Sequence, residues 1–428
     1  MRLIYSVAWW IALPLVLLRL LLRGRQEPGY RRHVAERLGF YGDVAHDGIS
    51  PILWVHAVSV GETRAAQPLI DALLAAYPAH RILLTHMTPT GRATGRELFG
   101  KQDRVIQSYL PYDTGWMVGR FLRHFRPQLC VLMETEVWPN VMAQCTQRRV
   151  PVALVNARLS QRSLNRALRF PALFGEAAAA MSCVAAQTDG DAQRIRQLGA
   201  PNVHVTGSIK FDVVPPAAML ERGAALRAQF GQRAVLTCAN TRDGEEALIL
   251  DALPSLDVAD ALLVIVPRHP QRFDEIARMI TARGLSLARR SSAGDTPIGD
   301  ARVFLGDSMG EMFAYYAASD IAFVGGSLLP LGGHNLIEAC AVGKPVLIGP
   351  HTFNFADAAD NAIAAGAALR IADAEELMKQ ATSLLLDERE RKQMGENARQ
   401  FSQQHGGATE RTMTLLAPLL VPQSMAAR

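Results

Sequence analysis

Short apolar runs alternate with amphipathic stretches along most of the chain, beginning at Ile52. In the first half the runs are ILWVHAVS, RILLTHMT, VIQSYLPYD, QLCVLMET, PVALVNAR, CVAAQ and VHVTGSIKF, and helical patterns such as residues 62–77 and 116–125 separate them. Apolar runs of this length are typical of parallel strands that helices cover on both faces. The pattern predicts a doubly wound α/β domain.

A second series of the same kind follows Pro215 and Pro216, which make a plausible domain boundary. Its apolar runs are AVLTCAN, ALLVIVP, RVFLG, IAFVGG and PVLIGP, and a charged helical tail extends beyond Ala374. We therefore predict two doubly wound domains in tandem, comprising residues 26–215 and 216–428.

Residues 3–22 are almost wholly apolar, and about 20 such residues suffice to span a bilayer. They run into arginines without a small-residue cleavage site, which disfavours a signal peptide. We predict that residues 1–25 form an uncleaved membrane anchor, with the rest of the chain in the cytoplasm by the positive-inside rule. A helix that lies flat in the membrane interface is the alternative.

Charge and cysteine usage narrow the possible partners. The chain has 428 residues, a net charge of +5 and 49% hydrophobic residues, and part of the basic excess follows the apolar start. This distribution predicts an anionic membrane surface as a partner, and no zinc-finger, RRM or basic-helix signature indicates nucleic-acid binding. The scattered cysteines predict buried free thiols and no structural metal: Cys130, Cys145, Cys183, Cys238 and Cys340.

Several loops that follow predicted strands of the first domain carry candidate chemistry. Glu62 follows Gly61 after the first strand, where its carboxylate could take a proton or merely complement the helix dipole. Glu134 and Glu136 end another strand, and in an extended backbone their side chains would point in opposite directions, which disfavours an acid/base pair. Lys210 is a cation at a predicted strand end, where it could bind an anionic substrate or simply be a solvated charge.

The second domain carries candidates for anion binding. Arg268 and His269 directly follow the apolar run ALLVIVP, and a guanidinium at a strand end can hold a phosphate. Residues 325–350, GGSLLPLGGHNLIEACAVGKPVLIGP, predict a ligand-binding turn in which glycines such as Gly333 let backbone approach a ligand. His334 could contact a ligand or cap a helix. Asn335 and Glu338, three apart on a predicted helix, would share one face.

Motifs of several nucleotide enzymes are missing from the sequence. No GxxxxGK[ST] loop occurs and no GxGxxG follows the first strand, which disfavours mononucleotide kinases and Rossmann dehydrogenases. No DxD-type acidic cluster lies in an obvious metal-binding loop, which disfavours a metal-clamped sugar diphosphate.

Six motifs in order resemble the 3-deoxy-D-manno-octulosonic acid (Kdo) transferase family of Gram-negative bacteria. They are LWVHAVSVGE, METEVWPN, VNARLS, TGSIKFD, PRHPQRF and the glycine-rich stretch 325–350. The resemblance implies a GT-B glycosyltransferase of the inner membrane, with two Rossmann-like domains facing a cleft. It also implies metal-independent, inverting transfer of Kdo from CMP-Kdo to the lipid A precursor, without a cofactor.

The same resemblance implies roles for individual residues. Glu62 would be the general base, and CMP would be held by Arg268, Met309, Asn335 and Glu338. Less defined positions in the cleft would be occupied by Gly61, Glu134, Lys210, His269, Gly333 and His334. Two alternatives stay open: another GT-B enzyme that uses a UDP-sugar, and a membrane-anchored nucleotide-binding module without catalysis. The number of Kdo residues added and the oligomeric state have no signature in the sequence.

Overall fold

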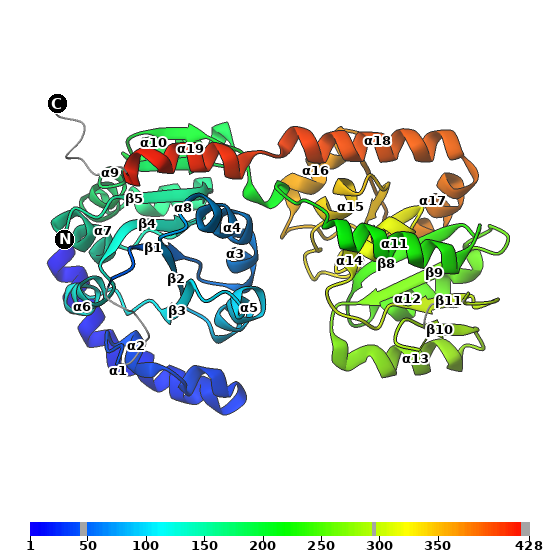
Figure 1. The fold of residues 1–428 in the computed structure, drawn as a ribbon, viewed down its shortest axis with the longest axis horizontal. Coiled ribbons are helices and arrows are strands. Elements are labelled where there is room, and N and C mark those ends of the chain that lie inside the picture. Colours follow the sequence, from blue (N-terminus) through cyan, green and yellow to red (C-terminus); the bar gives the residue numbers. More distant parts are fainter. Residues whose placement is uncertain (43–48, 293–296, 421–428) are drawn as a thin grey trace. The chain divides into compact units, whose positions relative to one another are not determined.

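The computed structural model describes residues 1–42, 49–292 and 297–420, which fall into two compact units (Figure 1). The first unit contains residues 1–212 together with the C-terminal segment that begins at residue 406, and the second contains residues 213–405. Each unit is built around its own seven-stranded sheet.

The sheet of the first unit is wholly parallel and has the order β3–β2–β1–β4–β5–β6–β7. Its strands are β1 (Ile52–His56), β2 (Arg81–His86), β3 (Val105–Tyr109), β4 (Pro127–Met133), β5 (Val152–Ala157), β6 (Cys183–Ala186) and β7 (Val203–Val205). The order reverses between β1 and β4, which pair with Leu53 opposite Leu129. In open α/β sheets, ligands bind beyond the strand ends at such a reversal.

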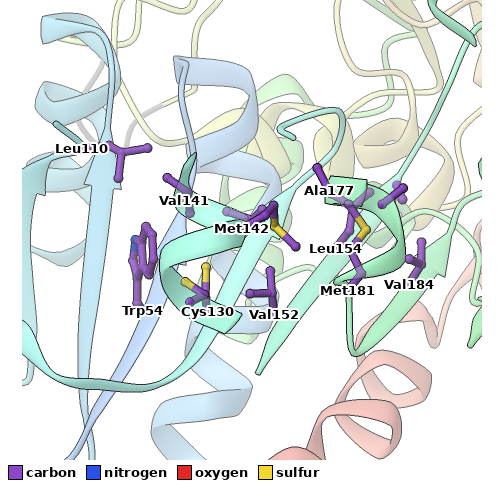
Figure 2. Packing of buried hydrophobic residues seen from close by; sticks show 14 of the residues in the cluster. Trp54, Leu110, Cys130, Val141, Met142, Val152, Leu154, Ala177, Met181 and Val184 are labelled. Atoms are coloured by element: carbon purple, nitrogen blue, oxygen red, sulfur yellow. The ribbon is translucent and has the colours of Figure 1, made fainter. Parts of the chain in front are cut away.

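Side chains from alternate positions of these strands enter two apolar layers, one on each face of the sheet. On one face Trp54, Cys130 and Leu154 pack with residues of the covering helices (Figure 2). On the other face Leu53, Val55 and their neighbours form a second core. The predicted doubly wound architecture of this half is thus confirmed.

The helices of the first unit are mostly short. Before β5 they are α1 (Arg2–Gln26), η1 (Pro28–Arg31), α2 (Val34–Arg37), α3 (Val60–Ala65), α4 (Gln67–Ala76), α5 (Pro89–Phe99), α6 (Gly115–Phe125) and α7 (Pro139–Gln147). After β5 they are α8 (Gln161–Ala167), η2 (Pro171–Gly175), α9 (Glu176–Ala179), α10 (Asp189–Gln197), η3 (Ile209–Phe211) and α19 (Ala408–Leu420). The helix predicted over residues 62–77 is two helices, because Pro68 starts a new one after Ala66.

The sheet of the second unit is also wholly parallel, in the order β10–β11–β9–β8–β12–β13–β14. Its strands are β8 (Val235–Thr241), β9 (Leu262–Pro267), β10 (Leu287–Arg289), β11 (Val303–Leu305), β12 (Ile321–Val324), β13 (Val346–Ile348) and β14 (Ala368–Arg370). Here the order reverses between β8 and β12, so the reversal lies beside the glycine-rich turn.

Helices cover both faces of this second sheet as well. They are α11 (Ala217–Phe230), α12 (Glu245–Ala252), η4 (Leu253–Ser255), η5 (Pro270–Arg272), α13 (Phe273–Ala282), α14 (Met312–Ala318), α15 (Ile337–Ala341), α16 (Ala356–Ala364), α17 (Ala374–Leu386) and α18 (Glu388–His405). The tandem of two Rossmann-like sheets confirms the predicted fold class.

The C-terminal segment departs from the predicted domain 216–428. After α18, helix α19 packs in the first unit, where Ala408 and Leu416 enter the core beside α4. The carboxylate of Asp212 accepts hydrogen bonds from the N–H groups of Ala408 and Thr409 and so caps α19. The prediction placed this helix in the wrong unit because its cap lies almost 200 residues away in sequence.

Helix α1 is long and apolar enough, by length and composition, to cross a membrane. One side of it nevertheless packs on the first unit: the Trp9 ring stacks on Tyr112 with centroids 5.7 Å apart, and Leu13 is buried beside Met117. The remaining apolar side chains point away from the unit and are largely exposed, for example Leu3, Ile4, Ile11 and Leu15.

Candidate active site

The Glu62 carboxylate is fixed at the start of α3, just beyond β1. Ser59 caps the helix, and its hydroxyl also donates to Glu62 Oε1 at 3.1 Å. The backbone N–H of Val58 donates to Glu62 Oε2 at 2.8 Å. The arrangement resembles a capping box, except that Glu62 accepts the N–H of Val58 rather than that of the N-cap residue Ser59, and the local sequence Ser-x-x-Glu sets the direction of the side chain.

The surroundings of Glu62 favour a carboxyl that can accept a proton. Partial burial raises its pKa, the Val58 N–H opposes the rise, and the Glu134 carboxylate adds to it. Burial, together with the charge of Glu62, also raises the pKa of Glu136 to about 7. Glu134 and Glu136 therefore both lie within electrostatic reach of Glu62.

Glu134 departs from the predicted extended geometry. Its φ of 57° is left-handed, so the premise that Glu134 and Glu136 point in opposite directions along an extended strand was wrong. The buried Glu134 carboxylate forms ion pairs with Lys210 Nζ at 2.8 Å and Arg158 Nε at 3.3 Å. These strand-end residues of the first unit thus form one connected charged group around Glu62.

The second unit places arginines beyond β8 and β9 and a histidine beyond β12. The backbone N–H of Arg268 donates to the Thr241 carbonyl, which joins the ends of β8 and β9. Burial and the nearby charges of Arg268 and Arg242 lower the pKa of His334 to about 4, and burial together with the charges of Arg242, Arg268 and Arg272 lowers the pKa of His269. The two guanidiniums form a positive region that suits a phosphate, and the neutral histidines beside them can still donate hydrogen bonds.

The glycine-rich turn is held by a buried carboxylate that the sequence did not single out. Glu245 is 0% exposed. Its carboxylate oxygens accept hydrogen bonds from the backbone N–H groups of Arg242 at 2.9 Å, Gly326 at 2.7 Å and Leu328 at 3.0 Å. A Cβ on Gly325 would lie only 2.8 Å from the Thr241 Cα, so the turn can approach β8 only with glycine there.

The remaining predicted residues are divided between the two units. Gly333 has a φ of 73°, and its N–H donates to the Gly326 carbonyl, so the second glycine pair folds back on the first. Met309 is 53% exposed in the loop before α14. Gly61 is exposed in α3.

Asn335 lies before α15 rather than within it, contrary to the prediction. Its side-chain oxygen accepts the N–H of Ile337, the first residue of the helix, which leaves only Glu338 in the first turn. The argument that both side chains share a helical face therefore fails, because the side chain of Asn335 caps the turn instead. Glu338 itself is half-buried.

Comparisons with known proteins identify the family. Residues 32–213 match the family model described as 3-deoxy-D-manno-octulosonic-acid transferase (kdotransferase), and residues 289–401 match the model of glycosyl transferases group 1. A 3-deoxy-D-manno-octulosonic acid transferase of Bordetella pertussis is 46% identical over 96% of this chain and 98% of its own length. The chain belongs to the Kdo transferase family.

A second relative agrees with this assignment, and a solved structure shares the fold. The 3-deoxy-D-manno-octulosonic acid transferase of Haemophilus influenzae is 36% identical over 98% of this chain and 99% of its own length. The UDP-GlcNAc 2-epimerase of Neisseria meningitidis covers 86% of this chain and 100% of its own, with a TM-score of 0.57 and 16% identity, so it shares the fold. The chain is accordingly a glycosyltransferase of GT-B architecture.

Proposed function

We propose that this Kdo transferase moves Kdo from CMP-Kdo to the lipid A precursor in lipopolysaccharide biosynthesis, by inversion and without a metal ion. The observation that carries the proposal is the Glu62 carboxylate, held by Val58 and Ser59 at the strand reversal of the first sheet. Membership of the family supports Kdo as the transferred sugar, and the residues around Glu62 support the proposed reaction.

Glu62 acts as the general base in this proposal. As the acceptor hydroxyl attacks the anomeric carbon of Kdo, its proton passes to the Glu62 carboxylate while the bond to the CMP phosphate breaks. Attack from the face opposite the leaving phosphate inverts the anomeric carbon. Partial burial favours this role because it raises the pKa of Glu62 and strengthens the base.

The cations of the second unit hold the leaving nucleotide in the same proposal. Arg268 and Arg242, with neutral His334, stabilise the negative charge that the CMP phosphate gains as its bond to Kdo breaks. Asn335 and Glu338 contact the ribose, and Met309 lies against the cytosine. The leaving CMP gains negative charge on a single phosphate, and these side chains can offset that charge without a metal.

Replacing Glu62 by glutamine tests the base directly. Glutamine can still accept the Val58 N–H and bond with Ser59, so the cap and the stability should change by less than about 1 kcal/mol. Loss of the base should lower kcat on the order of a hundred- to ten-thousand-fold. Product would be followed by mass spectrometry after incubation with CMP-Kdo and lipid A precursor. Near-normal transfer by Glu62→Gln would remove this residue from the chemistry.

The same mass spectrum counts the Kdo residues that the wild-type chain adds. Calorimetry separates the donors, because a CMP site should bind CMP more tightly than UDP, and the reverse order would favour a UDP-sugar enzyme. If CMP binds but no acceptor gains mass, a nucleotide-binding module without catalysis is the better description.

We further propose that α1 lies in the membrane interface on the cytoplasmic side of the inner membrane rather than crossing it. Its contacts with the rest of the first unit extend from Ser6, whose hydroxyl donates to Asn140, to Leu20, about 21 Å at 1.5 Å per residue. A spanning helix would have to give these contacts up. The exposed apolar side of α1 is then the side that enters the lipid.

Vesicle flotation with a matched pair of variants tests this membrane contact. Leu15 on α1 and Leu386 in the second unit are both 69% exposed. Leu15→Asp should weaken binding to vesicles that contain anionic lipid, whereas Leu386→Asp should bind as the wild type does. An N-terminal tag should be cleaved by protease added to inverted inner-membrane vesicles. Cleavage only from the opposite side would establish a spanning helix instead.

A further inference from the structure

A row of exposed arginines leads away from the charged group at Glu62 along the α8 segment. Residues 158–170, RLSQRSLNRALRF, contain four arginines and no acidic residue. Arg162 and Arg166 are one helical turn apart on α8 and share a face, and Arg169 lies two residues beyond the end of the helix. All three side chains are exposed, and within the described part of the chain none of them forms an ion pair with a carboxylate.

The row begins at the site already described. Arg158, its first member, pairs with Glu134, whose charge in turn raises the pKa of Glu62. The nearby carboxylate of Asp191 is occupied, because it accepts hydrogen bonds from the Leu159 N–H at 2.9 Å and Arg194 Nη2 at 2.9 Å. Its charge is therefore balanced by Arg194.

The far end of the row meets an apolar surface near α1. Leu168 and Phe170 follow the arginines and are 45% and 48% exposed. Next in the chain, Leu173 of η2 lines one cavity together with Arg2 at the start of α1. The segment thus runs from Arg158, which pairs with Glu134, through positive charge to exposed apolar side chains, and Leu173 just beyond them borders the start of α1.

We propose that Arg162, Arg166 and Arg169 bind the phosphate groups of the phosphorylated glycolipid acceptor. This proposal rests on the proposed function. The reacting sugar hydroxyl of such a ligand would meet the carboxylate base. The anionic groups on the same headgroup would meet the guanidiniums, and the acyl chains would meet the apolar side chains. Arginine suits phosphate because its planar guanidinium can donate two parallel hydrogen bonds.

The test variant is the triple substitution R162Q/R166Q/R169Q in the full-length protein. Arg158 is left unchanged because it holds Glu134. The matched control, R278Q/K379Q/R389Q, removes the same three charges from exposed positions of the second unit. Both variants and the wild type are assayed in neutral detergent with CMP-Kdo and either the phosphorylated acceptor or the same lipid after phosphatase treatment.

The triple variant should raise the KM for the phosphorylated acceptor about tenfold or more, with kcat within about twofold of the wild-type value. Its KM for the dephosphorylated lipid, and both constants of the control, should stay at wild-type values. An unchanged KM for the phosphorylated acceptor, or an equal rise for both lipids, would overturn the proposal.

Vesicle flotation makes the result independent of turnover. Neutral phosphatidylcholine vesicles carry either the phosphorylated acceptor or phosphatidylglycerol at the same charge. The triple variant should lose binding selectively to the acceptor vesicles, and an equal loss from both would mean that the row binds bulk anionic lipid and would refute the assignment. If the wild type transfers nothing yet this selective loss occurs, the proposed transferase reaction fails and the phosphate surface stands.

Discussion

Replacing Glu245 by glutamine should weaken nucleotide binding, although Glu245 is not itself one of the residues that contact the nucleotide in our proposal. Oε2 of Glu245 accepts two N–H groups, from Arg242 and Gly326, and Oε1 accepts the Leu328 N–H. The single amide oxygen of glutamine can keep the first two. Its NH₂ group then faces the Leu328 N–H, so one buried donor loses its partner.

The size of this effect follows from the three bonds. An unsatisfied buried donor costs about 1–3 kcal/mol, and hydrogen bonds to a charged acceptor exceed neutral ones by about 1 kcal/mol each. Relief of the desolvation of a buried charge offsets part of this, which leaves about 2–4 kcal/mol. Because CMP would have to reorder the loosened turn, each 1.4 kcal/mol of that cost lowers its affinity about tenfold.

Calorimetry with CMP on the full-length chain measures the loss, and Glu246→Gln is the control. Glu246 is also 0% exposed, but it pairs with Arg272, which keeps further ion pairs with Asp243 and Glu275. Glu246→Gln should therefore lower stability while CMP affinity changes little. The reasoning is refuted if Glu245→Gln binds CMP as tightly as the wild type, or if both variants lose affinity equally.

Two further predictions concern pH. Lys210→Met should move the acid limb of the kcat profile to higher pH, because the Lys210 ammonium lowers the pKa of Glu62 and its removal leaves Glu134 less neutralised; an unmoved limb would contradict this. Burial lowers the pKa of His56 to about 3 and of His86 to about 4, so the unfolded chain binds protons below about pH 6.5 that the folded chain does not. Stability should therefore fall as pH drops from about 6.5 to about 4, by up to about 1.4 kcal/mol per pH unit for each histidine. Denaturant titrations of the wild type and of His86→Gln measure the slopes, and their difference isolates the contribution of His86, because His334 adds a contribution of the same sign and Glu136 one of the opposite sign. Equal slopes in the two proteins would be inconsistent with a neutral buried His86.

The strands were predictable because parallel strands buried on both faces read as uninterrupted apolar runs, and each run named from the sequence contains or overlaps a strand. The ends of helices were less predictable. Asn335 was placed inside a helix because its spacing from Glu338 fits a helical turn, whereas its side chain caps the helix from outside. Local spacing does not distinguish these two uses of asparagine.

Long-range contacts set the other limit on the sequence-based predictions. Helix α19 was assigned to the second domain because it follows that domain in the chain, but its cap is Asp212 in the first unit. Glu245 was overlooked because its partners Gly326 and Leu328 lie more than 80 residues away. The hydrophobic periodicity of a sequence does not indicate which backbone N–H groups will donate to a buried carboxylate.

Glu62 and Glu245 each follow one of the two strands between which the strand order of their sheet reverses, yet they take opposite roles. Three backbone N–H groups surround Glu245, and at 0% exposure no substrate proton can reach it, so its carboxylate can only organise the turn. Glu62 accepts one backbone N–H and one hydroxyl, remains half-buried and has a raised pKa. Of the two, only Glu62 combines a fixed direction with access and basicity. The number of backbone donors around each carboxylate, rather than its place in the sequence, therefore decides which of them serves as the candidate base.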